Sequence, residues 1–451
     1  MELAGKRVLV VGLARSGEAV ARLLLRHGCR VTVNDGREEK PEEPQASALR
    51  ALGAPVVFGG HPLQLLDDRP DFIVKNPGIP YQIPLLQEAA RRGIPIYTEI
   101  EVASWLTRAP LVAITGSNGK TTTTTLVGEM LAQAGLTPVV AGNIGRVFAG
   151  VVETVAPDQP VVLEVSSFQL AGVETFRPRV GALLNLFPAH LDYHGSFEAY
   201  ADAKWRLFRN MAGDDVAVLN MDQQLLRERA KTLRCKVAWF SRREPVPEGA
   251  CLEDGQVVLY REGQRLPVLP VDAIALPGEH NLENALAACA IAVAAGGTPQ
   301  ACAQVLMRFR GVEHRLEFVR DVGGVAYYND SKSTNPTAAL QALRAFEGGI
   351  VWIAGGLDRG DDFSPLVPEV QRRVKAAVVL GQTAQKLATV CRAAGVRRVE
   401  PVQTLDEAVS AARRLAEPGD VVLLSPSCAS WDMFTSFEER GRIFKEAVHR
   451  L

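Results

Sequence analysis

The sequence contains few cysteines and no apolar run long enough to cross a membrane. Its seven cysteines are scattered over 451 residues without a CxxC pair. An odd number without paired spacing argues against a disulfide framework or a zinc site and favours a reducing compartment. The longest apolar run lies within ALAACAIAVAA at residues 285–295, whereas a membrane helix needs about 20 such residues. We therefore expect a buried helix there and no membrane insertion.

The chain also lacks an excess of charge of either sign. Its 50 basic and 51 acidic side chains give a formal net charge of −1, which provides no electrostatic footprint for nucleic acid. The opening MELAGKRVLVVG holds a short apolar strand with no cleavage-type segment after it, so we expect no signal peptide. These features predict a cytoplasmic protein without nucleic-acid partners, which we expect to be a monomer, and any anionic ligand must be met by local groups.

Length and patterning predict more than one domain. A chain of 451 residues exceeds what a single hydrophobic core usually accommodates, so two or three domains are expected. Apolar strand-like runs alternate with helical patterns from end to end, which is typical of parallel α/β architecture. We place the boundaries to give three blocks, at residues 1–98, 99–310 and 311–451.

The most informative segment is LVAITGSNGKTTTTTLV at residues 111–127. An apolar strand leads into a glycine-rich turn that ends in Gly119-Lys120-Thr121, followed by a helical pattern. Such a turn points backbone N–H groups and the positive end of a helix at a phosphate, while the lysine reaches the outer phosphates and the threonine hydroxyl can hold Mg²⁺. Thr115 stands where a full Walker A motif has glycine, so the loop is a shorter TGSNGKT form. The predicted ligand is a nucleoside triphosphate.

The first block contains a second glycine turn, GLARSG at Gly12 to Gly17, with Asp35 near the end of the next strand. This spacing is typical of dinucleotide folds. Two ligands compete: NAD, or the nucleoside diphosphate of a substrate such as a UDP-sugar. Because Ala14 would crowd a pyrophosphate and the stronger nucleotide loop lies elsewhere, we favour the second. A plain structural turn is the remaining alternative.

Two strands of the second block end in residues suited to metal or substrate binding. VVLEVSSFQL places Glu164 at the end of an apolar strand, where a bare carboxylate is costly unless a cation or strong donors meet it. Ligands of parallel sheets also gather at the carboxyl ends of strands. Glu164 is therefore a candidate Mg²⁺ ligand and Ser166 a candidate substrate contact. VGALLNLFPAH offers His190 with the same topology.

Lys204 lies on the apolar side of a predicted helix. SFEAYADAKWRLFRNM has Ser196 as a predicted N-cap, and a spacing of 3.6 residues puts Lys204 on the face of Tyr200, Ala201 and Leu207. A stem that snorkels along apolar surface is one interpretation. A carbamate near metal ions is another, and the residues alone do not decide between them.

Together with TGSNGKT and the stretch from His190 to Lys204, the segments EVSSFQ, GEHNLENALAA, GVEHR, NDSKSTNP and GGLDRG resemble the motifs of the Mur ligases. These are ATP-dependent amide-forming enzymes of peptidoglycan precursor synthesis, and the resemblance extends over almost the whole chain. Within the family, the opening GLARSG and the closing LLSPSCASWDMFTSFEERG are similar to members that add D-glutamate to UDP-N-acetylmuramoyl-L-alanine.

The resemblance implies an α/β fold of three domains. The first, residues 1–98, would be Rossmann-like and bind the UDP-linked substrate. The second, residues 99–310, would be a P-loop-type mononucleotide-binding domain with a parallel sheet and act as the ATPase. The third, residues 311–451, would be Rossmann-like and bind the amino acid and ATP.

The resemblance also implies roles for individual residues. It implies catalytic roles for six residues: Lys120, Glu164, His190, Lys204, His314 and Lys332. It implies ATP binding by the phosphate loop and by later segments: Gly116, Ser117, Asn118, Gly119, Lys120, Thr121, Thr122, Asn281, Asn284, Arg315, Asp330, Lys332 and Thr334. Mg²⁺, in two sites, would be held by four residues: Thr121, Glu164, His190 and Lys204, the last as N6-carboxylysine.

Substrate contacts are implied in all three blocks. For the UDP-linked substrate, the implied residues are Leu13, Ala14, Asp35, Gly36, Arg37, Gly78, Asn143, Ser166 and His190. For D-glutamate, they are Arg359, Lys332, Ser430, Trp431 and Phe437. Arg359 departs from the lysine of some members, which keeps the charge but changes reach and hydrogen-bond geometry. Trp431 could instead fill the core, and Arg37 could be a solvated surface arginine.

Rival functions explain fewer of these motifs. A nicotinamide dehydrogenase would account only for GLARSG and Asp35, and a P-loop switch only for TGSNGKT. The nearest alternative is a sister Mur ligase or a folylpolyglutamate synthetase that adds a different amino acid. A folate enzyme would not need a UDP site in the first block.

Overall fold

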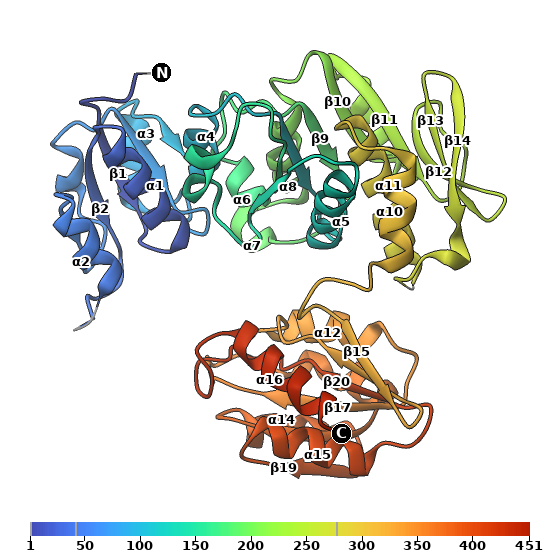
Figure 1. Cartoon of the computed structure of the whole chain (residues 1–451). Helices are drawn as coiled ribbons and strands as arrows, with labels where there is room; N and C mark the ends of the chain where they lie inside the picture. Colours follow the sequence, from blue (N-terminus) through green and yellow to red (C-terminus); the bar gives the residue numbers. More distant parts are fainter. Residues whose placement is uncertain (1, 41–42, 277) are drawn as a thin grey trace. The chain divides into compact units, whose positions relative to one another are not determined.

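The computed structural model describes residues 2–40, 43–276 and 278–451. The chain divides into two compact units, one ending at Phe309 and the other beginning at Arg310. The first unit contains a five-stranded and a nine-stranded sheet, and the second contains a six-stranded sheet (Figure 1). The predicted α/β architecture with three sheet domains is thereby confirmed.

The first sheet is entirely parallel, with strand order β3-β2-β1-β4-β5. Its strands are β1 (Arg7–Val11), β2 (Arg30–Asn34), β3 (Val56–Val57), β4 (Phe72–Lys75) and β5 (Ile96–Tyr97). The connecting helices are α1 (Arg15–Arg26), α2 (Pro44–Ala51), the 3-10 helix η1 (Leu63–Leu66) and α3 (Pro84–Arg91). β2 and β3 lie on one side of β1, and β4 and β5 lie on the other side. The GLARSG turn, which follows β1, therefore lies at the topological switch point, where ligands bind in such sheets.

Helix α4 (Glu99–Ser104) ties the first sheet to the second within the first unit. The buried Glu101 carboxylate accepts hydrogen bonds from the backbone N–H groups of residues 174–176, at 2.8 to 3.0 Å, and from the Trp105 indole. Thr98, just before the helix, donates its hydroxyl to the Gln169 carbonyl at 2.7 Å. A charged group with this many donors is well satisfied and holds the segment firmly.

Glu99 is a second buried carboxylate in this helix and should make stability depend on pH. It accepts hydrogen bonds from the Ala149 N–H at 3.1 Å and the Gln169 amide at 3.3 Å, and burial raises the pKa of Glu99 from 4.5 to about 7. The folded state therefore binds the extra proton between these values, and the associated stability is lost as pH rises through 7. Chemical denaturation at pH 5 to 8 should show the unfolding free energy falling with pH relative to Glu99→Gln. An unchanged difference between the two proteins would contradict this.

The second sheet has strand order β14-β13-β12-β11-β10-β9-β6-β8-β7. Its strands are β6 (Leu111–Thr115), β7 (Val139–Gly142), β8 (Val161–Glu164), β9 (Val180–Leu183), β10 (Gly213–Asn220), β11 (Cys235–Ser241), β12 (Gly249–Glu253), β13 (Gln256–Arg261) and β14 (Gln264–Pro270). Strands β6 to β12 pair in parallel, and β12, β13 and β14 pair antiparallel.

The antiparallel extension was not predicted from the sequence, although a signal was present. Asp254-Gly255 and Glu262-Gly263 form two-residue connections in which all four residues have positive φ, between 49° and 75°. Such turns match the twist of paired antiparallel strands, and Asp-Gly is one of their preferred sequences.

Helices α5 (Lys120–Gln133), α10 (Glu279–Ala294) and α11 (Pro299–Arg308) pack against one another over the second sheet. The predicted buried run is confirmed, because residues 285–293 of α10 are all buried. Elsewhere in this part of the unit lie η2 (Phe148–Gly150), η3 (Val152–Thr154), α6 (Ser167–Leu170), α7 (Leu191–His194), α8 (Phe197–Trp205), η4 (Arg206–Phe208), α9 (Gln224–Ala230) and η5 (Val271–Ala273). Among the described residues, no helix has the length and apolar character needed to span a membrane.

The sheet of the second unit has strand order β15-β16-β20-β17-β18-β19 and is parallel except between β15 and β16. Its strands are β15 (Glu317–Val322), β16 (Val325–Asn329), β17 (Ile350–Gly355), β18 (Val374–Leu380), β19 (Arg398–Pro401) and β20 (Val421–Leu424). Its helices are α12 (Pro336–Arg344), η6 (Ser364–Leu366), α13 (Val367–Arg373), α14 (Ala384–Ala393), α15 (Leu405–Leu415) and α16 (Phe437–His449). Strands β16, β20 and β17 are adjacent and parallel, so the loops that follow them begin side by side at the carboxyl edge of the sheet.

Candidate nucleotide and substrate sites

The predicted phosphate loop joins β6 to α5. Gly119 is the residue before the helix and has φ 81°, a left-handed conformation that favours glycine. A Cβ atom there would lie 2.2 Å from Asn284 Oδ1, so the position also lacks space for a side chain. The loop is braced by Asn185, which accepts hydrogen bonds from the Ser117 and Asn118 N–H groups at 3.0 and 2.9 Å. Asn185 was missed from the sequence, although it is the polar residue that follows the apolar run of β9.

Lys120 begins α5 and curls back over the loop that precedes it. Its Nζ donates to the carbonyls of Gly116 at 2.7 Å and Ser117 at 3.0 Å. The lysine charge and the positive end of a 14-residue helix are thus found at the same loop, which is the arrangement that binds phosphate. The predicted position of Lys120 in a strand-loop-helix unit is confirmed, and its catalytic role stays a prediction.

Thr121 and Asn143 are both hydrogen-bonded to Glu164 beside this loop. The Thr121 hydroxyl donates to Glu164 Oε2 and the Asn143 amide donates to Glu164 Oε1, each at 2.7 Å. All three residues come from the carboxyl-end side of β6, β7 and β8, and Glu164 is buried. The structure therefore brings together a predicted metal ligand from the loop, a predicted metal ligand from the sheet and a predicted substrate contact.

The chemistry of these donors fits Mg²⁺. This ion prefers oxygen ligands and is commonly bound through one or two carboxylates together with substrate phosphates, rather than by a cage made wholly of protein groups. A carboxylate and a hydroxyl 2.7 Å apart beside a phosphate loop supply such a set. Within the described residues, no three His, Cys, Asp or Glu side chains are grouped as a metal site.

Lys204 is buried near the same loop. The helix predicted around it is confirmed as α8, with Ser196 as its N-cap accepting from the Ala199 N–H at 3.1 Å. Lys204 Nζ donates to the Gly116 carbonyl at 2.9 Å and to Thr115 Oγ1 at 3.2 Å. Burial, and secondly the nearby Lys120 ammonium, hold the pKa of Lys204 well below its usual range, against the opposing effect of Glu164. The side chain points inward, which excludes a stem that snorkels to solvent.

His190 and Ser166 occupy different surroundings. His190 lies before α7 in a left-handed conformation with φ 53° and packs its ring on Phe168, with centroids 4.9 Å apart. Ser166 caps α6, accepting from the Gln169 N–H at 3.2 Å and donating to the Gln169 side-chain oxygen at 3.0 Å. The Ser166 side chain is partly covered and that of His190 is exposed, and their substrate and metal roles stay predictions.

Asn281 and Asn284 lie together at the start of α10, as their spacing predicted. The Asn284 amide donates to Asn281 Oδ1 at 3.4 Å, and Asn284 Oδ1 accepts from the Thr123 hydroxyl at 3.5 Å. Asn284 also meets the loop at Gly119. The two asparagines therefore border the phosphate loop. Thr122, another predicted ATP contact, is half-buried in the first turn of α5.

The predicted residues of the first sheet gather at its carboxyl edge. Asp35 accepts hydrogen bonds from the Leu13 N–H at 2.6 Å and the Arg37 N–H at 3.1 Å, which fixes the loop that also holds Ala14, the residue before α1. Arg37 pairs with Glu43 and lies over the Phe58 ring, 5.3 Å from its centroid. Arg37 is exposed despite these contacts, so the alternative of a solvated surface arginine stays open and its substrate role stays a prediction.

Two glycines of this edge are closely packed. A Cβ atom on Gly36 would lie 2.7 Å from the His61 ring, and one on Gly17 would lie 1.8 Å from the Gly12 carbonyl. Gly78 is held in place differently, since its N–H donates to Asn76 Oδ1 at 3.2 Å. The glycine pattern of GLARSG therefore reflects close packing of the turn against its own helix.

Lys75, at the end of β4, was missed by the sequence analysis. It is 1% exposed, and its Nζ donates to the Pro77 carbonyl at 3.0 Å and to the Tyr193 hydroxyl at 3.1 Å. Burial lowers the pKa of Lys75 to about 7. Because Tyr193 belongs to α7, this contact joins the loop of Gly78 to the segment that carries His190. A lone lysine after an apolar strand carries no sequence signal for such a partner.

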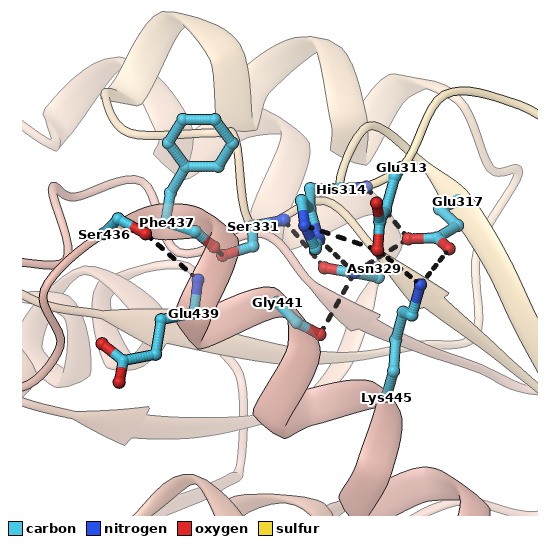
Figure 2. Close-up of polar contacts among 10 residues, drawn as sticks. All are labelled: Glu313, His314, Glu317, Asn329, Ser331, Ser436, Phe437, Glu439, Gly441 and Lys445. Carbon is cyan, nitrogen blue, oxygen red and sulfur yellow. Dashed lines mark hydrogen bonds and ion pairs between the residues drawn. The ribbon is translucent and has the colours of Figure 1, made fainter. Parts of the chain in front are cut away.

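In the second unit, His314 lies in a buried polar cluster (Figure 2). Its Nδ1 is 2.9 Å from the Asn329 amide, and its ring lies against Gly441, where a Cβ atom would be 2.1 Å from Nδ1. Lys445 bridges Glu313 and Glu317 at 2.9 and 2.8 Å beside it. Burial lowers the pKa of His314. These contacts place His314 between β16 and α16, directly before Arg315 in the chain.

Asp330 and Lys332 follow β16. Asp330 is buried and accepts hydrogen bonds from the Ser425 hydroxyl at 2.9 Å and the Leu316 N–H at 3.2 Å. Burial raises the pKa of Asp330 to about 7. The Lys332 N–H donates to the His314 carbonyl at 3.0 Å, and its Nζ lies 5.7 Å from the Phe437 ring centroid. Thr334 is half-buried in the same loop.

The predicted amino-acid contacts after β17 and β20 lie in neighbouring loops. The Arg359 guanidinium lies 4.6 Å from the centroid of the Trp431 ring, while Ser430 is buried. Leu357 and Ala429 form a backbone bridge that joins the two loops. Trp431 is 64% exposed, which excludes the core-filling alternative.

The fold and these contacts define a nucleotide-binding α/β protein in which a phosphate loop faces a buried carboxylate. Residues 6–98 match the family description "Mur ligase MurD-like, N-terminal domain". Residues 114–292 match "Mur ligase middle domain", and residues 314–428 match "Mur ligase, glutamate ligase domain". The chain belongs to the Mur ligase family, as the sequence motifs predicted.

Similar proteins of known name extend over the full chain. The UDP-N-acetylmuramoylalanine--D-glutamate ligase of Geobacillus kaustophilus (strain HTA426) is 50% identical over 449 residues, 99% of this chain and 98% of the relative. The enzyme of the same name from Bacillus cereus (strain G9842) is 48% identical over 450 residues, 100% of this chain and 99% of the relative.

Solved structures share the fold at lower identity. UDP-N-acetylmuramate-alanine ligase MurC from Thermotoga maritima aligns with a TM-score of 0.56 at 21% identity, with 99% of each chain covered. MurF ligase from the same organism, in complex with ADP, aligns with a TM-score of 0.54 at 16% identity, with 100% and 96% covered. At these identities the likeness establishes the fold alone.

Proposed function

We propose that this protein is an ATP-dependent, ADP-forming ligase that joins D-glutamate to UDP-N-acetylmuramoyl-L-alanine in peptidoglycan precursor synthesis. The observation that carries this assignment is the 50% identity, over 99% of the chain, to a relative named for that reaction. The phosphate loop facing the Thr121–Glu164 pair supports the ATP-dependent step. The seven free cysteines suit a reducing compartment, so we place the reaction in the cytoplasm. We also propose that the enzyme is a monomer.

The first chemical step activates the carboxylate of the alanyl substrate. That carboxylate attacks the γ-phosphorus of ATP, which forms an acyl phosphate and releases ADP. Two anions must approach each other, so Lys120 and the N-terminus of α5 offset their repulsion at the phosphates. Thr121 and Glu164 would hold Mg²⁺, with His190 and Lys204 as further candidate ligands, and the ion would supply positive charge that offsets the same repulsion.

The second step forms the amide. The D-glutamate amine attacks the acyl carbon to give a tetrahedral intermediate, which collapses to the amide with loss of phosphate and of a proton from the nitrogen. D-glutamate brings two carboxylates, so its site needs cations and hydrogen-bond donors. Arg359, Lys332, Ser430 and the loop of Trp431 and Phe437 supply them, with His314 supporting Lys332 through its carbonyl.

Lys204 is proposed to act as N6-carboxylysine. The amine attacks CO₂, which forms an N–C bond, releases a proton and leaves a carboxylate at the end of the side chain. Such a group replaces a cation by an oxygen ligand suited to Mg²⁺. The position of Lys204 against the Gly116 carbonyl supports a place beside the phosphate loop.

Each of the three blocks has a separate role in the proposed reaction. Residues 1–98 bind the UDP-linked substrate through Leu13, Ala14, Asp35, Gly36, Arg37 and Gly78, and Asn143 and Ser166 of the next block contact its alanyl end. Residues 99–310 bind ATP through the loop of Gly116 to Thr122 and through Asn281 and Asn284. Residues 311–451 bind the amino acid and contribute Arg315, Asp330, Lys332 and Thr334 to ATP binding.

The assignment is tested by phosphate release from ATP with UDP-N-acetylmuramoyl-L-alanine and one acceptor at a time. We expect release with D-glutamate and none with L-glutamate, L-lysine, meso-diaminopimelate or L-alanine. Release with another acceptor would keep the ligase class and reassign the amino acid. Absence of release with every acceptor would contradict the proposal and favour a regulatory nucleotide-binding role.

A further inference from the structure

Helix α16 carries a buried arginine to which the proposed reaction gives no role. Arg440 lies in the first turns of this helix and is 2% exposed. The neighbouring Arg442, two residues further along, is exposed to solvent. Arginine is rarely buried this completely without partners that use its donors, so its contacts are informative.

The guanidinium of Arg440 bridges two functional loops. Its Nε donates to Ser331 Oγ at 3.0 Å, and its Nη2 donates to the Ser331 carbonyl at 2.8 Å. Its Nη1 and Nη2 both donate to the Cys428 carbonyl at 3.1 Å. Ser331 directly precedes Lys332, and Cys428 lies two residues before Ser430.

A third loop packs against the same side chain. A Cβ atom on Gly356 would lie 3.3 Å from Arg440 Nη1 and 2.3 Å from the Ala429 carbonyl. Gly356 belongs to the GGLDRG segment that carries Arg359. The loops after β16, β17 and β20 therefore converge on one guanidinium. Ser331 is fixed to α16 a second time, since its hydroxyl donates to the Phe437 carbonyl at 2.8 Å (Figure 2).

Stability alone does not account for an arginine in this place. Its hydrogen bonds within the described structure all go to neutral groups of Ser331 and Cys428. Burial lowers the pKa of Arg440 to about 10, against the opposing electrostatic effects of Cys428, Asp432 and Asp330. A buried charge without a hydrogen-bonded ionic partner is costly, and apolar replacements of buried ions are often neutral or stabilising. A planar fork of N–H donors can, however, hold two backbone segments at a fixed separation, which a lysine cannot do.

We propose that Arg440 is a positioning residue of the acceptor amino-acid site, holding the Lys332 loop and the Ser430 loop at the separation that the amino-acid carboxylates require. The proposal rests on the function proposed above. Arg440 touches neither the substrate nor the reacting atoms, and it acts through the backbones of Ser331 and Cys428.

The test compares Arg440→Lys with Arg442→Lys, which makes the same charge-conserving substitution at an exposed position of the same helix. We expect Arg440→Lys to raise the KM for D-glutamate by about tenfold or more, as loss of a positioned charged hydrogen bond does. The KM for UDP-N-acetylmuramoyl-L-alanine should change less than about twofold, because its proposed contacts lie before Phe309. Arg442→Lys should leave both values unchanged.

A merely structural role would have a different signature. It would reduce the amount of active enzyme, and hence the apparent kcat, without a selective change in the KM for D-glutamate. That result, or an equal rise in both KM values, would overturn the proposal. If Arg440→Lys does not fold, the test uses Ser331→Ala, which removes the hydroxyl that accepts from Arg440 Nε. A selective rise in the KM for D-glutamate in this variant would support the proposal, and an unchanged KM would overturn it. Failure of the wild-type protein to use D-glutamate would instead refute the function itself.

Discussion

Lys120→Met should lower the rate of D-glutamate-dependent phosphate release by about 10²–10³-fold or more. Lys120 is the first residue of α5, and its Nζ lies within 3.0 Å of the Gly116 and Ser117 carbonyls of the phosphate loop. The Lys120 ammonium stabilises the phosphates most strongly in the transition state, when negative charge shifts during phosphoryl transfer. Removal of the ammonium therefore raises the activation barrier more than it weakens ground-state binding of ATP. Steady-state kinetics with varied ATP would separate kcat from KM.

A matched control is available in the same unit. Lys236 is exposed and pairs with Asp214 at 2.8 Å on the surface, so Lys236→Met removes the same side chain far from the proposed chemistry. Surface pairs of this kind contribute little, and we expect activity close to wild type. Equal activity of the Lys120 and Lys236 variants would show that the loop does not serve phosphoryl transfer.

Lys204→Ala should abolish activity, and a small carboxylic acid such as acetate should partly restore it. The buried side chain ends against the Gly116 carbonyl and Thr115, and truncation to alanine leaves room for a diffusible carboxylate. If the native side chain is carbamylated, that carboxylate supplies the missing oxygen ligand. Phosphate release should therefore rise with acetate concentration in the variant and not in wild type.

The outcomes separate two interpretations of Lys204. A fully active alanine variant would refute a functional role at this position. An inactive, folded variant that no carboxylic acid restores would refute the carbamate and favour a direct role of the ammonium. Thermal unfolding of both proteins shows whether loss of activity reflects loss of fold, since removing a buried side chain can cost a few kcal/mol.

The phosphate loop and Glu164 could be predicted because their signal is local. A strand, a glycine turn, a lysine and a helix follow one another within 17 residues of LVAITGSNGKTTTTTLV, and the same local order folds in the structure. Glu164 was recognisable because a carboxylate at the end of an apolar strand needs a partner. The place of Lys204 on the apolar face of its helix also followed from helical spacing, whereas the inward orientation of its side chain and its partners did not.

Residues that act through distant partners could not be predicted in this way. Asn185 braces a loop 67 residues away, Lys75 contacts a tyrosine 118 residues away, and Arg440 reaches Ser331 over 109 residues. Hydrophobic periodicity specifies which face of an element is buried, but it does not say which buried polar groups meet. These contacts depend on the strand order of each sheet, which brings remote loops to the same edge.

The antiparallel extension of the nine-stranded sheet has a consequence for behaviour at high protein concentration. It makes β14 a terminal strand of the sheet, and an open strand edge can template pairing with another chain. β14 contains Pro267 and Pro270, and its register shifts opposite Val257 and Val258. Proline has no N–H to donate a hydrogen bond to a neighbouring strand, and a bulge twists the strand edge away from a partner. We therefore expect this edge of the sheet to resist pairing with other chains, and hence aggregation, during synthesis and refolding.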